Sequence, residues 1–285
     1  MAALLVAAAW AIVPAYRAIS LVANAPLRVA PPAPGDLGVE DVRFPAADGV
    51  RLAGWLVPGA PSAPAVVLVH GFKSDRAEML PWARFLHDAG YAVLLFDRRA
   101  CGQSDGWTIA LGAREQDDVA GAVRLLRDRL GSVPIGVLGI SLGAGIAVRA
   151  AAVDPTIAAV VADSVWTDQD FQLDRLRAFR VGPVDLPQPP YGEALVNALA
   201  GADVRADARP LRDVATLRPG QAIFLIHSVD DANATTPPSA EVALFAAAHQ
   251  PKREWRTTGG HIGARSAHPD EYDRRVLDFF AEFLR

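Results

Sequence analysis

The alternation of short apolar runs with segments of helical periodicity is the feature that most limits the folds open to this chain. Five runs are almost continuously apolar, as expected of strands buried on both faces of a parallel sheet. They span residues 65–69, 92–96, 135–140, 157–161 and 222–226. Helix-period segments lie between or after them, at residues 77–89, 114–130, 142–153, 238–249 and 269–284. Strands that alternate with helices predict an α/β fold with a mostly parallel, doubly wound sheet.

Two regions depart from this alternation. Residues 39–44 and 50–57 are strand-like and flank the turn signal Asp48-Gly49, so they predict an antiparallel hairpin before the parallel strands. Residues 167–219 hold scattered prolines and short amphipathic pieces, which predict an inserted cap. Ligands of open α/β sheets bind at the carboxyl ends of the strands, so a cap in this position would overhang the binding crevice.

Residues 1–25 form a separate hydrophobic segment in which Arg17 is the only charged side chain. This length suffices for a helix that crosses a bilayer, so we expect a hydrophobic N-terminal helix that is an uncleaved membrane anchor or lies on the membrane. The alternative is a helix packed on the protein's own surface. Arg17 and Arg28 follow the apolar run, which favours a cytoplasmic catalytic domain but leaves the side of the membrane open. Residues 26–37 are rich in proline and predict a linker, and residues 38–285 then form one domain that contains the cap.

Composition and charge exclude several classes of function. A formal net charge of −4 without a long Lys/Arg run argues against a nucleic-acid partner. Cys101 is the only cysteine, so the chain has neither an internal disulfide nor a cysteine-based metal cluster. We therefore expect no metal and no organic cofactor, and a small-molecule substrate. Cys101 itself is read as a turn residue, with a nucleophilic thiol as the alternative. The oligomeric state stays open.

The pentapeptide Gly139-Ile140-Ser141-Leu142-Gly143 is the most specific chemical motif. It follows an apolar strand directly and precedes an Ala-rich helix. A nucleophile at a sharp strand-to-helix turn needs small residues two positions before and two after it, where neighbouring backbone comes close. The helix that begins at Leu142 directs its free N–H groups toward the place where an oxyanion would form. Ser141 is therefore the predicted nucleophile, and a serine in an ordinary tight turn is the alternative.

Serine is a weak nucleophile at neutral pH, so it needs a base, and the base needs an acid that holds its tautomer. His261 follows Gly259-Gly260 in a loop beyond the last strand and is the predicted base, with His268 as its main competitor. Asp231 lies after the run 222–226 and is the predicted acid. Asp230 and Asp163, which also follow strands, remain alternative acids.

The oxyanion needs a second N–H donor besides that of Leu142. His70-Gly71-Phe72 follows the strand 65–69, and Gly71 allows a turn that directs the N–H of Phe72 toward Ser141. An ordinary turn after a strand is the alternative.

Several segments together resemble the α/β-hydrolase superfamily, in particular the membrane-tethered, serine-aminopeptidase-like hydrolases grouped with Bem46-type proteins. These segments are VLVHGF, LLFDRRACGQSDG, GISLGAG, IHSVDDANATTP and GGHIGARSAHPDEY. The resemblance implies a nucleophile at Ser141, an acid at Asp231, a base at His261 and oxyanion donors at Phe72 and Leu142. Two departures stand out: Ala100 replaces the first glycine of the usual turn, and the longer loop before Pro237 leaves the choice between Asp230 and Asp231 open.

The expected function is hydrolysis of a carboxylic ester or related acyl bond through a Ser-His-Asp triad and an acyl-enzyme. An acyltransferase, a thioesterase or a peptidase would use the same triad, and a catalytically silent binding protein on the same scaffold is the rival of another class. Aromatic side chains at the cap suggest an apolar acyl site. They are Trp166, Phe171, Phe179 and Tyr191.

Overall fold

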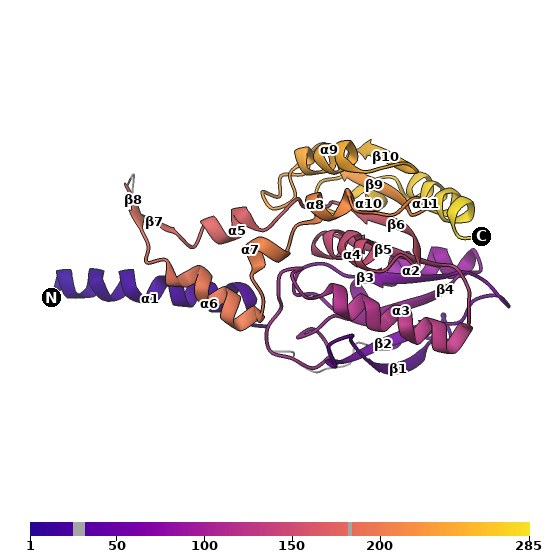
Figure 1. Ribbon diagram of the computed structural model, residues 1–285, viewed down its shortest axis with the longest axis horizontal. Helices are drawn as coiled ribbons and strands as arrows, with labels where there is room; N and C mark the ends of the chain where they lie inside the picture. Colours follow the sequence, from indigo (N-terminus) through magenta and orange to yellow (C-terminus); the bar gives the residue numbers. More distant parts are fainter. Residues whose placement is uncertain (25–31, 182–183) are drawn as a thin grey trace.

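A single eight-stranded sheet forms the centre of the computed structural model, which describes residues 1–24, 32–181 and 184–285 (Figure 1). The strand order is β1-β2-β4-β3-β5-β6-β9-β10. These strands are β1 (Glu40–Pro45), β2 (Arg51–Val57), β3 (Ala65–Val69), β4 (Ala92–Asp97), β5 (Ile135–Ile140), β6 (Ile157–Asp163), β9 (Ala222–Ser228) and β10 (Lys252–Thr257). β2 is antiparallel to both of its neighbours, β1 and β4, and every pairing from β4 to β10 is parallel. The predicted fold class, a mostly parallel sheet preceded by a hairpin, is confirmed.

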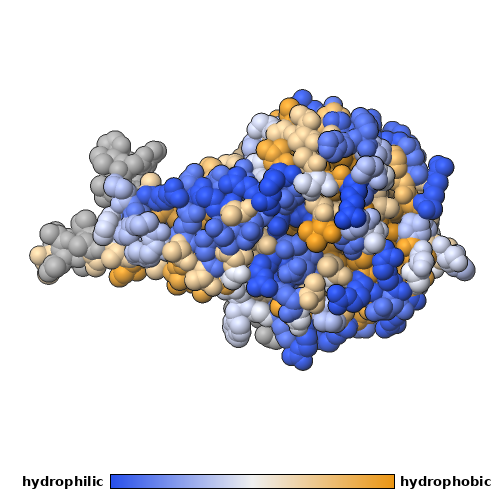
Figure 2. Space-filling view, viewed as in Figure 1, coloured by the Kyte–Doolittle hydropathy of each residue, from blue (hydrophilic) through white to orange (hydrophobic). Residues whose placement is uncertain are grey.

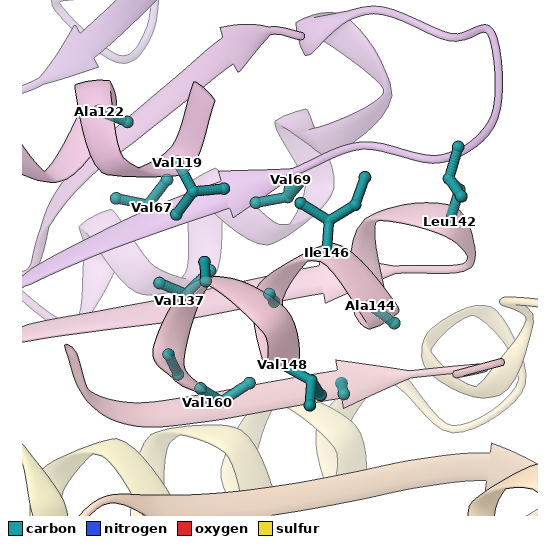
Figure 3. Close-up of a cluster of buried hydrophobic side chains, with 14 of the residues drawn as sticks. Val67, Val69, Val119, Ala122, Val137, Leu142, Ala144, Ile146, Val148 and Val160 are labelled. Atoms are coloured by element: carbon teal, nitrogen blue, oxygen red, sulfur yellow. The ribbon is translucent and has the colours of Figure 1, made fainter. Parts of the chain in front are cut away.

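Helices cover both faces of the sheet, as the doubly wound prediction requires. They are η1 (Arg76–Met79), α2 (Leu80–Asp88), α3 (Gln116–Leu130), α4 (Leu142–Val153), α9 (Pro238–Ala247), α10 (Ala264–Ala267) and α11 (Pro269–Phe283). Successive strand residues point to opposite faces, so Val66 and Val67 belong to two different cores. The core around Val67 packs against α3, α4 and α9, and Figure 3 shows the part of it between the sheet, α3 and α4. The core around Val66 packs against α2 and α11.

The cap leaves the carboxyl end of β6 and returns to the sheet at β9. Its elements are α5 (Asp170–Asp174), β7 (Ala178–Val181), β8 (Val184–Pro187), α6 (Tyr191–Ala200), α7 (Val204–Asp207) and α8 (Pro210–Val214). The antiparallel pair β7-β8 was not expected from the sequence. In Figure 1 this region projects from the sheet beside the N-terminal helix.

The N-terminal helix α1 (Ala2–Val22) packs along the cap helix α6 (Figure 1). Pro14, Ala18 and Val22, which are spaced by four residues, are buried and so form the packed face. Trp10 Nε1 donates to the carbonyl of Pro187 at 2.7 Å, and the Arg17 guanidinium donates to the carbonyls of Arg175 and Ala178. The chain start is thereby joined to the cap.

Within the described ranges, no helix is long and apolar enough to span a membrane. The prediction of a membrane-spanning anchor is therefore not supported. The alternative reading, a helix packed on the protein's own surface, agrees with the contacts of α1. Residues 26–31 of the predicted linker lie outside the described residues. The other face of α1 exposes Ile12, Tyr16 and Ile19. Figure 2 shows hydrophobic surface along the lower edge of the projection.

Candidate active site

Ser141 stands at the junction where β5 passes into α4. Its backbone has φ 52° and ψ −120°, a left-handed conformation that strains any residue with a side chain. The N–H of Ser141 donates to the carbonyl of Asp163 on β6 at 2.9 Å, which holds the strained turn against the sheet. The local sequence therefore forms the sharp strand-to-helix turn that the motif predicts.

The two motif glycines permit the close backbone approach that this turn requires. A Cβ on Gly139 would lie 2.1 Å from the carbonyl oxygen of Gly143, and a Cβ on Gly143 would lie 2.2 Å from that of Val69. Both distances are far shorter than a nonbonded contact permits. Only glycine at these positions lets α4 start immediately over β3 and β5.

A hydrogen-bonded series links the predicted nucleophile, base and acid. His261 Nε2 lies 2.9 Å from Ser141 Oγ, and His261 Nδ1 lies 2.9 Å from Asp231 Oδ2. A carboxylate only accepts hydrogen bonds, so we assign the ring proton to Nδ1, and Nε2 is then free to accept the hydroxyl proton of Ser141. Thr236 Oγ1 also contacts both Asp231 Oδ2 and His261 Nδ1, at 3.1 and 3.0 Å. Sequence reasoning did not single out Thr236.

The two adjacent aspartates hold different parts of the histidine loop. Asp231 is buried and faces His261, whereas Asp230 is exposed and accepts the N–H groups of Gly259 and Gly260 at 3.0 and 3.1 Å. The backbone N–H of Gly260 is the largest cause that lowers the pKa of Asp230. Asp230 therefore fixes the turn that carries His261 but does not touch the ring.

Asp163, the other alternative acid, lies beneath the site. It is fully buried, and it accepts hydrogen bonds from Tyr272 Oη at 3.0 Å and Ser164 Oγ at 3.1 Å. Ser164 Oγ in turn accepts the N–H of Ile262 at 3.1 Å. Burial raises the pKa of Asp163 to about 6. Asp163 makes no hydrogen bond to His261 in the part of the chain that the structure describes, so it supports the histidine loop from below.

His268, the competing base, lies away from Ser141. Its Nε2 is 3.1 Å from Thr258 Oγ1, and its ring packs edge-on against Trp255. It precedes α11 and is half-buried there.

The predicted oxyanion donors lie on two sides of Ser141. Leu142 is the first residue of α4, where N–H groups have no acceptor within the helix. Phe72 follows Gly71, and a Cβ on Gly71 would lie 3.6 Å from Ser141 Cβ. The loop after β3 thus passes directly beside the nucleophile.

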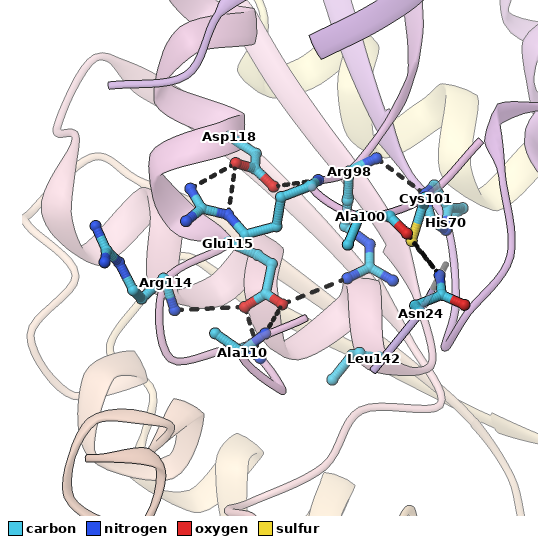
Figure 4. A network of polar contacts seen from close by, with 12 residues as sticks. Asn24, His70, Arg98, Ala100, Cys101, Ala110, Arg114, Glu115, Asp118 and Leu142 are labelled. Atoms are coloured by element: carbon cyan, nitrogen blue, oxygen red, sulfur yellow. Dashed lines mark hydrogen bonds and ion pairs between the residues drawn. The ribbon is translucent and has the colours of Figure 1, made fainter. Parts of the chain in front are cut away.

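The peptide groups of Gly71 are held from opposite directions. The Gly71 carbonyl accepts Arg98 Nη2 at 2.6 Å and contacts His70 Nδ1 at 2.9 Å, while the Gly71 N–H donates to Glu78 Oε2 at 2.7 Å. Burial holds the pKa of His70 well below its usual value, and its Nε2 accepts the N–H of Arg98 (Figure 4). His70 is therefore a neutral ring that fixes this loop.

Buried charged groups lie beneath the loop that follows β3. Arg98 Nη1 lies 3.9 Å from Glu115 Oε1, and Glu115 accepts the backbone N–H of Ala110 at 2.7 Å (Figure 4). Cys101 is buried beside Asn24, and burial raises the pKa of its thiol to about 11. The thiol is therefore protonated at neutral pH, which removes it as an alternative nucleophile.

Comparison with known proteins agrees with this geometry. The profile of the alpha/beta hydrolase fold family matches residues 64–182, a range that contains Ser141 and the loop after β3. The esterase Pf2001 of Pyrococcus furiosus has a TM-score of 0.73 and 27% identity, covering 91% of this chain and 99% of that one. This chain has the α/β-hydrolase fold.

Two curated relatives of this α/β hydrolase are fungal. Thiohydrolase aneE of Aspergillus aculeatus is 34% identical over 126 residues, which are 42% of this chain and 40% of that protein. Polyketide transferase grgF of a Penicillium species is 32% identical over 127 residues, which are 43% of each chain. The matches span less than half the length of these relatives.

A cavity of about 340 Å³ opens at Ser141 in this α/β hydrolase. Its lining is Gly71, Phe72, Glu78, Leu111, Ser141, Leu142, Trp166, Gln169, Gln172, Asn233, Thr235, Thr236, His261 and Ile262. Phe171 and Tyr191 are not among these residues, and the side chain of Phe179 lies outside what the structure describes. Trp166 is buried and donates from Nε1 to the carbonyl of Leu142. The expected apolar wall is therefore a mixed one, rich in amides and hydroxyls.

A second hollow of about 320 Å³ adjoins the first, because Phe72 and Gln172 line both. Its other walls are Tyr16, Arg17, Ser20 and Leu21 of α1, and Arg175 and Leu176 of the cap. The N-terminal helix thus borders the approach to Ser141. Among the described residues, no group of three or more His, Cys, Asp or Glu side chains is arranged to hold a metal ion.

Proposed function

We propose that this α/β hydrolase cleaves a carboxylic ester or a related acyl bond, with Ser141 as nucleophile, His261 as base and Asp231 as acid. The observation that carries the proposal is the pair of 2.9 Å contacts from His261 to Ser141 Oγ and to Asp231 Oδ2. The strained turn at Ser141 presents the hydroxyl at the cavity, which is the geometry that nucleophilic attack requires.

The proposed reaction proceeds through an acyl-enzyme. Ser141 Oγ attacks the acyl carbon while His261 Nε2 takes the hydroxyl proton, and Asp231 stabilises the resulting imidazolium. The N–H groups of Phe72 and Leu142 bind the oxyanion. His261 then returns the proton to the leaving oxygen or sulfur as the old acyl bond breaks. A water molecule, deprotonated by His261, releases the acid and restores Ser141.

Acyl transfer is a second candidate, which the names of relatives favour. One relative is named a thiohydrolase and another a polyketide transferase. In both reactions the acyl-enzyme forms in the same way, and the difference lies in whether water or another nucleophile accepts the acyl group. We propose hydrolysis as the basal reaction and a thioester as an alternative substrate to an oxygen ester.

The finer resemblance to serine-aminopeptidase-like, Bem46-type hydrolases also remains a proposal. The exposed side chains Ile12, Tyr16 and Ile19 support a peripheral contact of α1 with a lipid surface, without a membrane span. We expect the full chain to float with anionic vesicles, and a variant with Ile12→Ser and Ile19→Ser to remain unbound. Equal flotation of both would refute this contact.

Labelling with a fluorophosphonate probe tests the proposed function. We expect the wild-type protein to be labelled and Ser141→Ala to lose all labelling. Ser62→Ala is the matched control, because Ser62 also has a positive φ, of 60°, but does not line the cavity. A wild-type protein that does not react, or labelling that persists in Ser141→Ala, would establish a silent scaffold or a different nucleophile.

A further inference from the structure

Glu78 places a carboxylate in the wall of the active-site cavity. It belongs to the short helix η1 after β3 and lines the same cavity as the nucleophile. The position of a Cβ on Gly71 would lie 3.3 Å from Glu78 Oε2 and 3.6 Å from Ser141 Cβ. The carboxylate and Ser141 therefore both lie close to the space left by the missing side chain of one glycine.

Only one oxygen of this carboxylate is used by the protein. Oε2 accepts the N–H of Gly71 at 2.7 Å, and Oε1 has no hydrogen-bond or ion-pair partner among the described residues. The nearby Arg98 guanidinium is directed to the Gly71 carbonyl and to Glu115 instead. The charge of Glu78 thus stays unpaired at the cavity.

The rest of the described lining supplies no positive charge to balance Glu78. It holds no Lys and no Arg, and His261 is its only other titratable side chain. A fixed negative charge beside the place where an oxyanion develops opposes the transition state, since like charges repel strongly where water is scarce. A cation on the substrate would turn this repulsion into attraction.

We propose that the substrate carries a cationic group, such as an ammonium, that pairs with Glu78 Oε1 while its acyl carbon lies at Ser141. This inference rests on the proposed hydrolase function and names the substrate class of the same site. Amide and hydroxyl groups line the same cavity and solvate a polar substrate. They are Gln169, Gln172, Asn233, Thr235 and Thr236. The cavity of about 340 Å³ has room for a small ester or thioester.

The variant Glu78→Gln separates the charge from the loop contact, because an amide oxygen still accepts the N–H of Gly71. Glu40→Gln is the matched control, since it removes one negative charge from the exposed strand β1. Two isosteric substrate pairs report on the cation. On the acyl side they are the nitrophenyl esters of 3-aminopropanoate and butanoate, and on the alcohol side acetylcholine and 3,3-dimethylbutyl acetate.

We expect Glu78→Gln to lower the cationic-to-neutral ratio of kcat/KM by about tenfold in at least one pair, as loss of one close charge partner in a partly dry site implies. The loss should lie mainly in the KM of the cationic esters. Neutral esters should be hydrolysed faster than before, because the charge that opposes the oxyanion is gone. Glu40→Gln should leave the cationic-to-neutral ratio unchanged. Loss of activity on all four esters alike would show that Glu78 only positions the loop. An unchanged ratio in both pairs would also overturn the proposal.

Calorimetric titration with choline tests the proposed cation site independently of turnover. We expect Glu78→Gln to weaken choline binding by about fivefold or more relative to the wild-type protein. If the wild-type protein hydrolyses no ester, the proposed function fails, and choline binding still reports on the cation site. Equal binding by both proteins, or none by either, would refute that site.

Discussion

Replacement of Asp231 by Asn tests which carboxylate supports His261. The Asp231 side chain is fully buried, and its Oδ2 lies 2.9 Å from His261 Nδ1, so it faces the ring that would become an imidazolium in the proposed attack. Two unit charges about 4 Å apart attract by about 4 kcal/mol at an effective dielectric constant of about 20. This energy corresponds to a loss of about 10³-fold in rate. An amide at position 231 also no longer favours the productive tautomer of His261.

Asp230→Asn is the matched control for this experiment. Its side chain is exposed, and an amide oxygen still accepts the N–H groups of Gly259 and Gly260, so we expect less than about a fivefold loss. The assay is kcat/KM for nitrophenyl acetate and the rate of fluorophosphonate labelling, with thermal unfolding to verify the fold. Asp231→Asn within tenfold of the wild-type protein, or Asp230→Asn as the more damaging change, would contradict the assignment.

Two further predictions concern stability and the N-terminal helix. Burial raises the pKa of Asp163 from 3.8 to about 6, so the folded protein keeps a proton that the unfolded chain has released, and this group's contribution to stability falls as the pH rises from about 4 to about 6. Between pH 4 and pH 7, the free energy of unfolding measured with urea should fall by about 3 kcal/mol more in the wild-type protein than in Asp163→Asn. An equal pH dependence of both proteins would contradict the raised pKa of Asp163. Lys73 Nζ donates to the carbonyls of Ser20 and Ala23 at the end of α1, so Lys73→Met should increase amide hydrogen exchange in residues 10–23 by about fivefold or more. Lys252→Met removes the same type of contact from the end of α9 and should leave the exchange of residues 10–23 unchanged. If both variants increased that exchange equally, Lys73 would not stabilise α1 locally.

The parts of the fold that depend on short stretches of sequence were predictable. The apolar run before Ser141 and the Ala-rich helix after it are contiguous, so their pattern fixes β5, the turn and α4. Gly139 and Gly143 reveal the close packing of that turn, because no other residue fits there. The same reasoning located the strand ends that carry Asp231 and His261, since parallel strands end at one edge of the sheet.

The features that depend on contacts between distant segments were not predictable. Asp230 and Asp231 are adjacent and chemically identical, and only the position of the histidine loop decides which one faces the ring. The aromatic side chains of the cap suggested an apolar pocket, yet Phe171 and Tyr191 do not line the cavity. Trp166 does line it, together with the amides of Gln169 and Gln172. The apolar sequence of α1 predicted a membrane anchor, because hydropathy alone does not distinguish a helix that packs against α6.

The contacts of the loop after β3 explain how a turn of so few residues supports chemistry. An oxyanion donor is effective only when its N–H is already oriented before the charge develops. Here Arg98 donates to the carbonyl of Gly71, and Glu78 accepts the N–H of Gly71. Two residues further on, the ammonium of Lys73 donates to a carbonyl at the end of α1.

The residues on either side of the Phe72 N–H are therefore held by three separate segments: η1, the turn after β4 and the N-terminal helix. Because Glu78 both accepts the N–H of Gly71 and lines the cavity, a cation bound at its Oε1 would also act on the loop that carries the proposed donor. Under the two proposals, substrate recognition and oxyanion geometry would thus depend on one carboxylate.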